Sequence, residues 1–341
     1  MEIAIETKWD EWEEWNLRCG SIFQSRYFAE AIKKSGMDVE LITLKEHDKI
    51  IGGCFAFIPF KTFPIKYFTD YRIVNGPILQ RFDLEILSKT LEFIENRAKS
   101  YHAISLPLKL PFTDITDFMQ KKGYNVSNNA PTFSFHIDLT ANEEKLWNEL
   151  DKKTRNSIRK AEKNNVIVRE IKDKSELKIA YSLYMTRAKS KKGWIPYPLK
   201  FFEALHDSMG SDLVILIAEY QNKIIAEAMF LKYNNCMLYF NNGSLPEYWD
   251  ACANTLLVWE AMKLAKSRGC MLFDLYGTSD GKNKDDINYG LYQFKSGFGG
   301  KLVETATFAN KIISPLRKKI WGRLLPIALP IYKKISGGID E

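Results

Sequence analysis

The sequence predicts an α/β protein in which one unit occurs twice, each copy with a mixed, partly antiparallel sheet. An apolar strand, a turn and a second strand are expected at 41–57 and again at 214–230. Short peptides repeat in the same order in both halves: Lys49-Ile50-Ile51 with Lys223-Ile224-Ile225, Ala98-Lys99-Ser100 with Ala265-Lys266-Ser267, and Lys121-Lys122-Gly123-Tyr124 with Lys295-Ser296-Gly297-Phe298. The first and third pairs lie 174 residues apart and the second lies 167 apart. Such a nearly constant spacing indicates a duplicated unit.

The first copy, with the residues before it, is expected to form a domain over 1–140. Its longest predicted helix places Leu84, Leu87, Leu91 and Ile94 at helical spacing. The predicted order is two short helices within 8–36, a hairpin at 39–60, a connector at 61–80, a helix at 82–100, a strand at 102–106, a helix near 114–122 and a strand at 131–139.

The second copy is expected to form a domain over 141–300. It opens with a predicted helix at 142–164, for which Thr140 and Glu143 have the spacing of a capping box. Further predicted elements are helices at 174–190 and 199–209, a hairpin at 212–232, a strand at 236–241, a helix at 251–268, a strand at 270–275 and a polar loop at 276–290. No linker rich in Gly, Ser or Pro separates the halves.

Length and composition suit two folded domains. The chain has 341 residues, of which 45% are hydrophobic. This is enough for two domains of about 150 residues each and excludes global disorder. A net charge of +7 favours anionic partners such as phosphates, nucleic acid or acidic lipid, although a lysine-rich soluble surface is the simpler explanation.

Cysteine and histidine spacing argues against disulfides and metals. The five cysteines are unpaired in spacing and the four histidines lie far apart, so we expect a reducing compartment and no metal. The acidic first fifteen residues contain no apolar signal segment, which predicts a cytoplasmic protein.

Residues 274–300 form the segment most suited to chemistry. Asp274 ends a predicted strand, Gly277 permits a turn, and Tyr289 leads into a short apolar helix that carries Phe294 and Lys295. We expect Gly277 and Tyr289 to contact the substrate. A lysine among aromatic residues can clamp a phosphate or stabilise developing negative charge, but it can equally well extend out of an apolar helix into solvent. The glycines of 297–300 would let the backbone approach a ligand closely.

A basic segment, 152–169, supplies a second candidate. Arg155 and Arg159 lie four residues apart, and Lys152, Lys160 and Lys163 widen the basic face. Like charges at this spacing destabilise a helix slightly, so an anionic ligand would explain them. A solvated basic face is the alternative.

Together, these segments resemble the FemABX aminoacyltransferases. The resemblance is carried by KTRNSIRKA at 153–161, by Asp274 with Gly277, by GLYQFKSGFGG at 290–300 and by FQSRYFAEA at 23–31. It implies two tandem GNAT-like domains, the second catalytic. It also implies transfer of an amino acid from charged tRNA to an amine of a phosphate-bearing peptidoglycan precursor, without a bound cofactor. Lys295 matches the lysine at the family's catalytic centre, with Phe294 beside it; Asp274 and the substrate's own groups are candidates for the general base.

The chain departs from the family pattern at two cationic positions. The lysine that helps to hold the acceptor's pyrophosphate would fall near Ile32, with Lys33 adjacent, and an arginine of the second domain is replaced by Lys191. A lysine can meet phosphate only as a point charge, without the bidentate fork of arginine. The helical arm of some members is absent from 141–300.

The loop at 190–198 is expected to bind the acceptor. Lys191 and Lys192 would hold phosphates there while Trp194 and Tyr197 stack on a sugar or base. An ordinary turn between two helices explains the same residues equally well.

Two other functions stay open. One is an acyl-CoA-dependent GNAT N-acyltransferase that acts on a sugar or peptide amine, although 241–257 lacks the glycine pair of a CoA-binding loop. The other is a catalytically silent protein that binds the precursor.

The tail, 301–341, is expected to pack back on the first domain or to lie on a membrane. Residues 313–338 mix basic and apolar side chains, and the longest uncharged run, 324–332, is too short to cross a bilayer, which takes about twenty residues.

Overall fold

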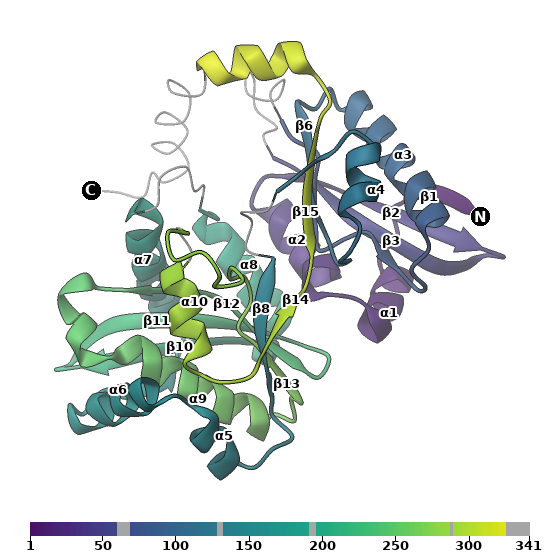
Figure 1. Cartoon of the computed structure of the whole chain (residues 1–341). Helices are drawn as coiled ribbons and strands as arrows, with labels where there is room; N and C mark the ends of the chain where they lie inside the picture. The colour runs from purple at the N-terminus through teal and green to yellow at the C-terminus, as the bar shows by residue number, and fades with distance from the viewer. Residues whose placement is uncertain (60–68, 128–131, 191–195, 287–288, 325–341) are drawn as a thin grey trace. The chain divides into compact units, whose positions relative to one another are not determined.

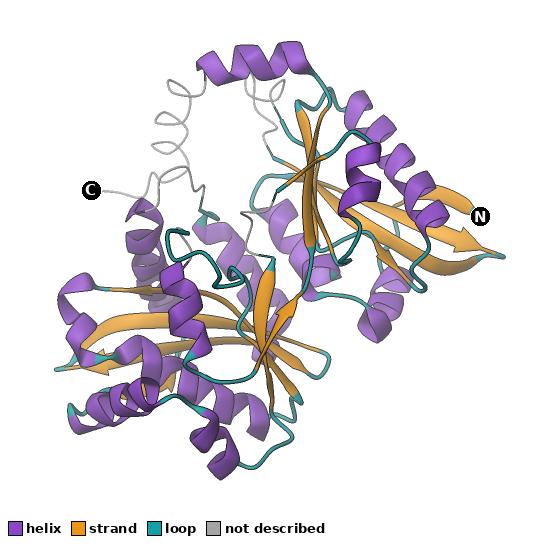
Figure 2. Cartoon of the chain, viewed as in Figure 1, coloured by secondary structure: helices purple, strands orange, loops and turns teal. Residues whose placement is uncertain are grey.

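The computed structural model describes residues 1–59, 69–127, 132–190, 196–286 and 289–324. The chain divides into two compact units, one made of Met1–Ala130 with Thr305–Glu341 and the other of Pro131–Glu304. Each unit is built on one sheet that helices cover (Figure 1; Figure 2).

The first sheet has the strand order β1-β2-β3-β4-β6-β15-β7, and β5 pairs with β3. Its strands are β1 (Glu2–Glu6), β2 (Asp38–Glu46), β3 (Lys49–Ile58), β4 (Arg72–Val74), β5 (Ile78–Leu79), β6 (Ser105–Leu110), β7 (Asn125–Val126) and β15 (Thr307–Ile312). The helices are α1 (Asp10–Cys19), η1 (Ile22–Gln24), α2 (Arg26–Lys34), α3 (Leu84–Ser100) and α4 (Thr116–Lys121). Asp83 begins α3 by accepting the amide hydrogens of Glu85 and Ile86, and the helix buries Leu87 and Leu91 in the core.

The second sheet has the strand order β14-β8-β13-β12-β11-β10-β9. Its strands are β8 (Phe133–Asp138), β9 (Ile167–Glu170), β10 (Leu213–Tyr220), β11 (Lys223–Tyr233), β12 (Cys236–Ser244), β13 (Leu272–Asp274) and β14 (Lys301–Glu304). The helices are α5 (Glu143–Glu149), α6 (Lys152–Lys163), α7 (Lys174–Ser190), α8 (Leu199–Met209), η3 (Gly210–Asp212), η4 (Pro246–Ala251), α9 (Ala253–Ser267) and α10 (Tyr289–Ser296). The apolar side of α9, including Leu257 and Met262, is fully buried.

The sequence repeat corresponds to a repeated backbone detail. The hairpin β2–β3 has a register shift between Leu44 and Lys45, and the hairpin β10–β11 has one between Ala218 and Glu219, again 174 residues later. Both turns carry two residues of positive φ, at 47–48 and 221–222, which is the geometry of a tight hairpin turn. Each unit also contains a parallel strand pair, β4–β6 and β12–β13, and a helix lies in the connection of each pair, α3 in the first and α9 in the second. The repeated Lys-Ile-Ile follows the turn in both hairpins.

Several predicted elements differ from the structure. The strand predicted at 102–106 is β6, at Ser105–Leu110, and the predicted connector 61–80 contains β4 and β5. The strand predicted at 131–139 as the end of the first copy is β8, which pairs with β13 and β14 of the second sheet. The predicted helix 142–164 is two helices, because Leu150 is extended and Asp151 caps α6 by accepting the amide hydrogen of Thr154. The cap of α5 is Asn142, whereas the Thr140 hydroxyl donates to Asp138.

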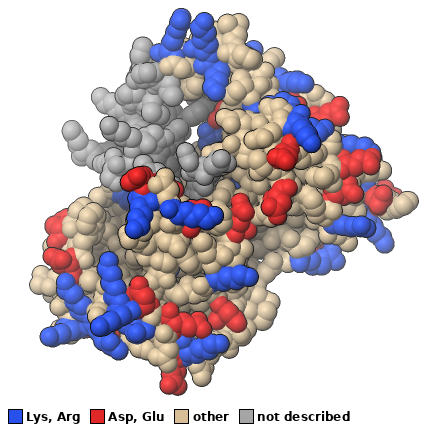
Figure 3. Space-filling model, viewed as in Figure 1, with Lys and Arg blue, Asp and Glu red and all other residues tan. Residues whose placement is uncertain are grey.

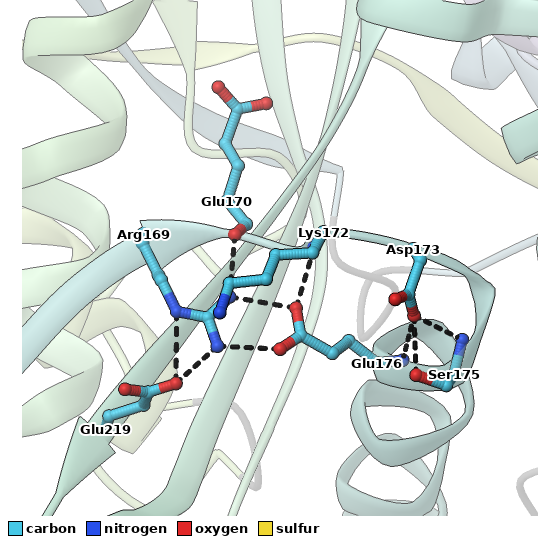
Figure 4. Close-up of polar contacts among 7 residues, drawn as sticks. All are labelled: Arg169, Glu170, Lys172, Asp173, Ser175, Glu176 and Glu219. Atoms are coloured by element: carbon cyan, nitrogen blue, oxygen red, sulfur yellow. Dashed lines mark hydrogen bonds and ion pairs between the residues drawn. The ribbon is translucent and has the colours of Figure 1, made fainter.

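A half-buried ion-pair network fixes the start of α7 to the sheet (Figure 4). Arg169 of β9 donates through Nη1 and Nη2 to the two oxygens of Glu176 at 2.8 and 2.7 Å, and through Nε to Glu219 of β10 at 3.0 Å. Asp173 caps the helix by accepting from Ser175 and Glu176. A bidentate guanidinium–carboxylate pair is directional, so the network sets the angle at which α7 crosses the sheet.

The described part of the tail, 301–324, consists of β14 in the second sheet, β15 and a helix at 315–324. β15 lies between β6 and β7 in the first sheet, and Arg317 donates to the His102 carbonyl at 2.6 Å. Leu316, Ile320 and Leu324 remain 71%, 41% and 40% exposed. Among the described residues, no helix has both the length and the apolar character that a membrane crossing requires.

We predict that Gly243→Ala destabilises the second unit by about 1–3 kcal/mol. A Cβ at this position would lie 2.2 Å from the backbone carbon of Leu183 in α7, so helix and strand would have to move apart. Urea unfolding measures the loss. Gly290→Ala is the matched control, since a Cβ there has no neighbour within 4 Å; equal stability of the two variants would contradict the prediction.

Candidate active site

A gap between β12 and the chain after β13 forms the centre of the second unit. The two strands pair in parallel only over Cys236–Leu238 and Leu272–Asp274. After Asp274 the chain follows β8 instead, because the Leu275 amide donates to Phe135 and the Thr278 amide to Phe133. β12 continues to Ser244 paired with β11 alone on this stretch. The strands therefore diverge and leave polar backbone groups facing the gap.

Lys295 occupies this gap. Its side chain extends from α10 and is only 5% exposed. The ammonium donates to the carbonyls of Tyr276 and Gly277, the latter at 2.9 Å, and lies 5.8 Å from the centre of the Tyr239 ring of β12. Gly277 has a φ of 55°, which turns its carbonyl group in a way that few other residues tolerate. Lys295 therefore does not extend into solvent, and Gly277 contacts it directly.

The glycines after Lys295 pack against protein. A Cβ at Gly297 would lie 2.2 Å from the Thr154 hydroxyl, one at Gly299 2.9 Å from the Glu149 carbonyl oxygen, and one at Gly300 2.6 Å from the His136 carbonyl oxygen. The Asp151 amide also donates to the Gly297 carbonyl at 2.9 Å. These glycines let α10 approach α5, α6 and β8, in contrast to the ligand contact expected from the sequence.

Asp274 is engaged in holding the turn together. It accepts a hydrogen bond from the Ser134 hydroxyl and one from the Tyr276 amide at 2.7 Å, and its Oδ2 lies 3.7 Å from His136 Nε2. Burial by itself would raise the pKa of Asp274, but His136 and these hydrogen bonds outweigh it and lower the pKa. A carboxylate with a lowered pKa is a weak base, so this environment does not suit the predicted role of general base.

The second unit also contains a buried carboxyl, that of Glu227 in β11, which is not predicted from the sequence. It is 1% exposed, and its Oε1 has no hydrogen-bond partner among the described residues. Burial raises the pKa of Glu227 well above its ordinary value, an effect that the charge of Arg187 opposes. Burial likewise raises the pKa of Tyr239, and the charges of Arg187 and Glu227 act on it too. Arg187, from α7, donates to the Asn242 carbonyl at 3.3 Å.

A cavity of about 230 Å³ opens at the start of α9. Phe294, the neighbour of Lys295, lines it together with Tyr248, Trp249 and Cys252. Phe294 also contacts Phe298 edge to face at 5.3 Å, which fixes its ring. Helix α10 thus places its lysine in the gap and its phenylalanine at this cavity.

Both predicted arginines of α6 make local contacts. Arg155 donates to the carbonyls of Leu150 and Asn148 at the end of α5, and the Arg159 guanidinium lies 5.3 Å from the Trp147 ring centre. Because α5 and α6 are separate helices, these side chains cover the junction between them.

The other predicted binding residues are dispersed. Lys33 belongs to the first unit, where it lies 5.5 Å from the Trp9 ring centre and lines a cavity of about 630 Å³. Tyr289 stacks on Tyr292 at 6.0 Å. Tyr197 stacks on Phe201 at 4.1 Å, and its amide donates to the Tyr184 hydroxyl, so it anchors the entry to α8. Lys191, Lys192 and Trp194 lie outside the described residues.

One sequence signal could have indicated Glu227. It is the single charged residue in the apolar run IIAEAMFL at 224–231, and an acid within a buried strand is rare unless it has a partner or a function. Arg187 and Tyr239 carry no such signal, because only the packing of α7 on β11 and β12 brings them close.

The second unit matches a known domain family. Residues 149–296 match the model of the acetyltransferase (GNAT) domain. The lipid II:glycine glycyltransferase of Staphylococcus haemolyticus is 28% identical over 131 residues, which span 37% of this chain and 31% of that protein. That of Staphylococcus aureus is 21% identical over an alignment of 404 residues, spanning 93% of this chain and 95% of the relative. The chain thus spans about a third of one relative and nearly all of the other.

Solved structures share the fold over most of the chain. The crystal structure of FemX superposes with a TM-score of 0.72 at 17% identity, covering 95% of this chain and all of that one. A tandem GNAT protein from the clavulanic acid biosynthesis pathway gives a TM-score of 0.60 at 11% identity, covering 92% and 99%. These likenesses confirm the predicted fold class of two tandem GNAT-like domains with mixed sheets.

We predict that Glu227→Gln makes the free energy of unfolding less sensitive to rising pH. Since the pKa of Glu227 is raised in the folded state, its contribution to stability is complete below the unfolded pKa of about 4.5 and is lost as the pH rises through the folded pKa. Glutamine cannot ionise. The free energy of unfolding, measured in urea from pH 5 to pH 9, should therefore fall more steeply in the wild type.

Glu176→Gln serves as the control of opposite sign. Arg169 lowers the pKa of Glu176, so the wild-type carboxylate stabilises the fold above its unfolded pKa, and the variant should lose stability at neutral pH. If the free energy of unfolding changed with pH in the same way in the wild type and in Glu227→Gln, the prediction that Glu227 is buried in its neutral form would be contradicted.

Proposed function

Because the chain belongs to the FemABX family of acyltransferases, we propose that it transfers an aminoacyl group from aminoacyl-tRNA to an amine of a peptidoglycan-type envelope precursor. The relatives named lipid II:glycine glycyltransferase support the reaction class and the kind of acceptor. The observation that carries the proposal is the buried ammonium of Lys295, held by two carbonyls where β12 and β13 diverge.

The reaction requires stabilisation of negative charge. The neutral amine of the acceptor attacks the ester carbonyl, a C–N bond forms, and the C–O bond to the ribose breaks as the ribose oxygen takes up a proton. Charge gathers on the carbonyl oxygen in the transition state, where a fixed cation in a site of low dielectric lowers the barrier. Lys295 has both properties, since Tyr276 and Gly277 fix its position before the substrate arrives. We assign it to the carbonyl oxygen or to the phosphate next to the ester.

The proton of the attacking amine passes to the substrate in this proposal. Asp274 is committed to Ser134 and Tyr276, and its pKa is lowered. Its role is to hold the turn that presents the Tyr276 and Gly277 carbonyls to Lys295. This leaves the ribose oxygen or a phosphate of the substrate as the proton acceptor.

The connection between β12 and α9 favours a donor other than acyl-CoA. A CoA-binding loop uses successive glycine amides to hold the pyrophosphate. Here Gly243 is needed for the approach of α7, since a Cβ would overlap Leu183, and the connection continues as η4, which carries Trp249. The cavity lined by Phe294 and Trp249 is therefore proposed to receive the acyl end of the donor, with a nucleobase against the exposed ring.

Lys191, Trp194 and Tyr197 of the second unit are proposed to contact the acceptor, and Lys33 of the first unit is proposed separately as a phosphate-binding residue. Lys33 lines a cavity of the first unit, where a cation suits the pyrophosphate of a lipid-linked or nucleotide-linked precursor. Tyr197 follows Lys191 and Trp194 closely in the sequence.

One experiment separates this function from the two alternatives. The protein is incubated with a precursor amine and with labelled aminoacyl-tRNA or labelled acetyl-CoA as donor. Transfer of label from tRNA alone is expected. Transfer from CoA would instead support the alternative GNAT N-acyltransferase, which the GNAT family model favours, and precursor binding without transfer would support a non-catalytic role.

Lys295→Met is predicted to lower the rate of transfer by about 10²–10³. Methionine fills the gap but brings neither the charge nor the hydrogen bonds to the Tyr276 and Gly277 carbonyls. Single-turnover transfer from charged tRNA measures the effect, with thermal unfolding as a check on folding. Lys266→Met is the matched control, because Lys266 also donates from a helix to a carbonyl, that of Leu139 at 2.8 Å. Wild-type transfer by a folded Lys295→Met protein would contradict the role.

The helix at 315–324 is predicted to bind anionic membranes, where a lipid-linked acceptor resides. Leu316, Ile320 and Leu324 lie four residues apart and point outward, with Lys319 and Arg323 beside them, as in a helix at a lipid surface. Replacing the three apolar residues with serine should reduce flotation with vesicles containing phosphatidylglycerol at least about tenfold. Transfer to a lipid-free precursor should stay unchanged; equal flotation of both proteins would contradict the prediction.

A further inference from the structure

One face of α6 carries lysines that the fold does not use. The arginines of this helix, Arg155 and Arg159, contact α5. Lys152, Lys153 and Lys160 are exposed, and among the described residues none of the three has an ion pair. Clustered like charges destabilise a helix slightly, so their position calls for an anionic partner. Figure 3 shows basic side chains gathered in the region of α6.

These lysines surround a hollow. With Asn156, Ser157 and Cys252 they line a shallow cavity of about 490 Å³. Lys153, Asn156, Ser157 and Lys160 follow the i, i+3, i+4, i+7 spacing of one helix face. The face thus combines cations with hydrogen-bonding side chains.

The hollow adjoins the cavity at the start of α9. Cys252 lines both, since its left-handed conformation, with a φ of 58°, places it at the corner between η4 and α9. On the far side of Cys252 lie Phe294 and Trp249, the latter 65% exposed. The two cavities therefore meet at Cys252, and Phe294, the residue next to Lys295, lines the second of them.

We propose that Lys152, Lys153 and Lys160 bind the phosphate backbone of the RNA that carries the acyl group, and direct its 3′ end toward Trp249 and Phe294. This inference rests on the proposed function, in which the donor is a charged tRNA. Unpaired lysines bind phosphates without reading sequence, and an exposed tryptophan gives a base a surface on which to stack. An anionic membrane fits less well, because the face is concave and presents amide and hydroxyl groups in place of apolar side chains.

Salt dependence of binding gives the first test. Three lysine–phosphate contacts contribute about 2–3 to the slope of log K against log salt concentration. Replacing Lys152, Lys153 and Lys160 together with alanine should weaken binding of uncharged tRNA at least about tenfold at 0.1 M KCl and flatten the slope by that amount. Fluorescence anisotropy across a KCl series measures both quantities.

A control of equal charge change distinguishes contact from net charge. Lys145, Lys174 and Lys263 also lie in the second unit, but each is paired with a carboxylate, those of Glu149, Asp207 and Glu260. Their triple alanine variant removes the same three charges and should leave the slope nearly unchanged. Equal effects of the two triple variants would overturn the proposal.

Donor length gives the second test. Transfer is measured from full-length aminoacyl-tRNA and from an aminoacylated CpA dinucleotide, which has a single phosphodiester and lacks the rest of the backbone that the three lysines are proposed to bind. The lysine variant should lower the ratio of kcat/KM for the long donor to that for the short one about tenfold. An unchanged ratio would overturn the proposal, and so would a variant that loses binding to phosphatidylglycerol vesicles but keeps its affinity for tRNA.

The outcomes also separate this inference from the function on which it rests. If the wild type transfers from neither donor but binds tRNA through these lysines, the proposed reaction is wrong and the RNA-binding face stands. If it transfers from charged tRNA and the lysine variant binds tRNA as tightly as the wild type, the reaction stands and the RNA-binding face is wrong.

Discussion

A buried ammonium organises the second unit. The parallel pair β12–β13 ends after three residues, and the chain beyond Asp274 keeps its hydrogen bonds to β8. Two carbonyls would then face a desolvated gap, which is costly unless a donor fills it. Lys295 supplies that donor from α10, and the position of α10 in turn depends on glycines that fit closely against α5, α6 and β8. The turn, the helix and the cation are therefore one assembly, and a change in any of them displaces the others.

Local patterns in the sequence were sufficient for the repeated hairpins. The repeated Lys-Ile-Ile tripeptide follows a tight turn in each hairpin and lies beside a register shift. Both features depend on residues close together in the chain. Sheet membership depends on distant partners instead. β8 follows the first copy in sequence, yet its hydrogen bonds go to strands that begin more than 130 residues later. The break within 142–164 also depends on a distant partner. Asp151 caps α6, and its amide donates to the carbonyl of Gly297, which is far away in the sequence.

The candidate site could be predicted in part. Lys295 and Phe294 were identified from a motif and share one short helix, so their proximity follows from the sequence alone. Glu227, Arg187 and Tyr239 come from β11, α7 and β12, and only the close packing of α7 at Gly243 brings them together. The sequence identifies the basic segment as a whole but does not separate its buttressing arginines from its exposed lysines. Arginines with planar, multiple donors bind carbonyls and an aromatic ring at the α5–α6 junction, whereas the lysines stay on the surface.

The place of β15 in the first sheet has a consequence for how the chain is made. This strand lies between β6 and β7, and β7 pairs with β15 alone among the described strands. The whole second unit precedes β15 in the chain and begins and ends on paired neighbours, β8 and β14. During synthesis on the ribosome the second unit is therefore complete while the first still lacks a strand of its sheet. The first unit is the first to be synthesised, but its sheet is the last to be completed. Until β15 is added, the open edge of this sheet is exposed to other chains.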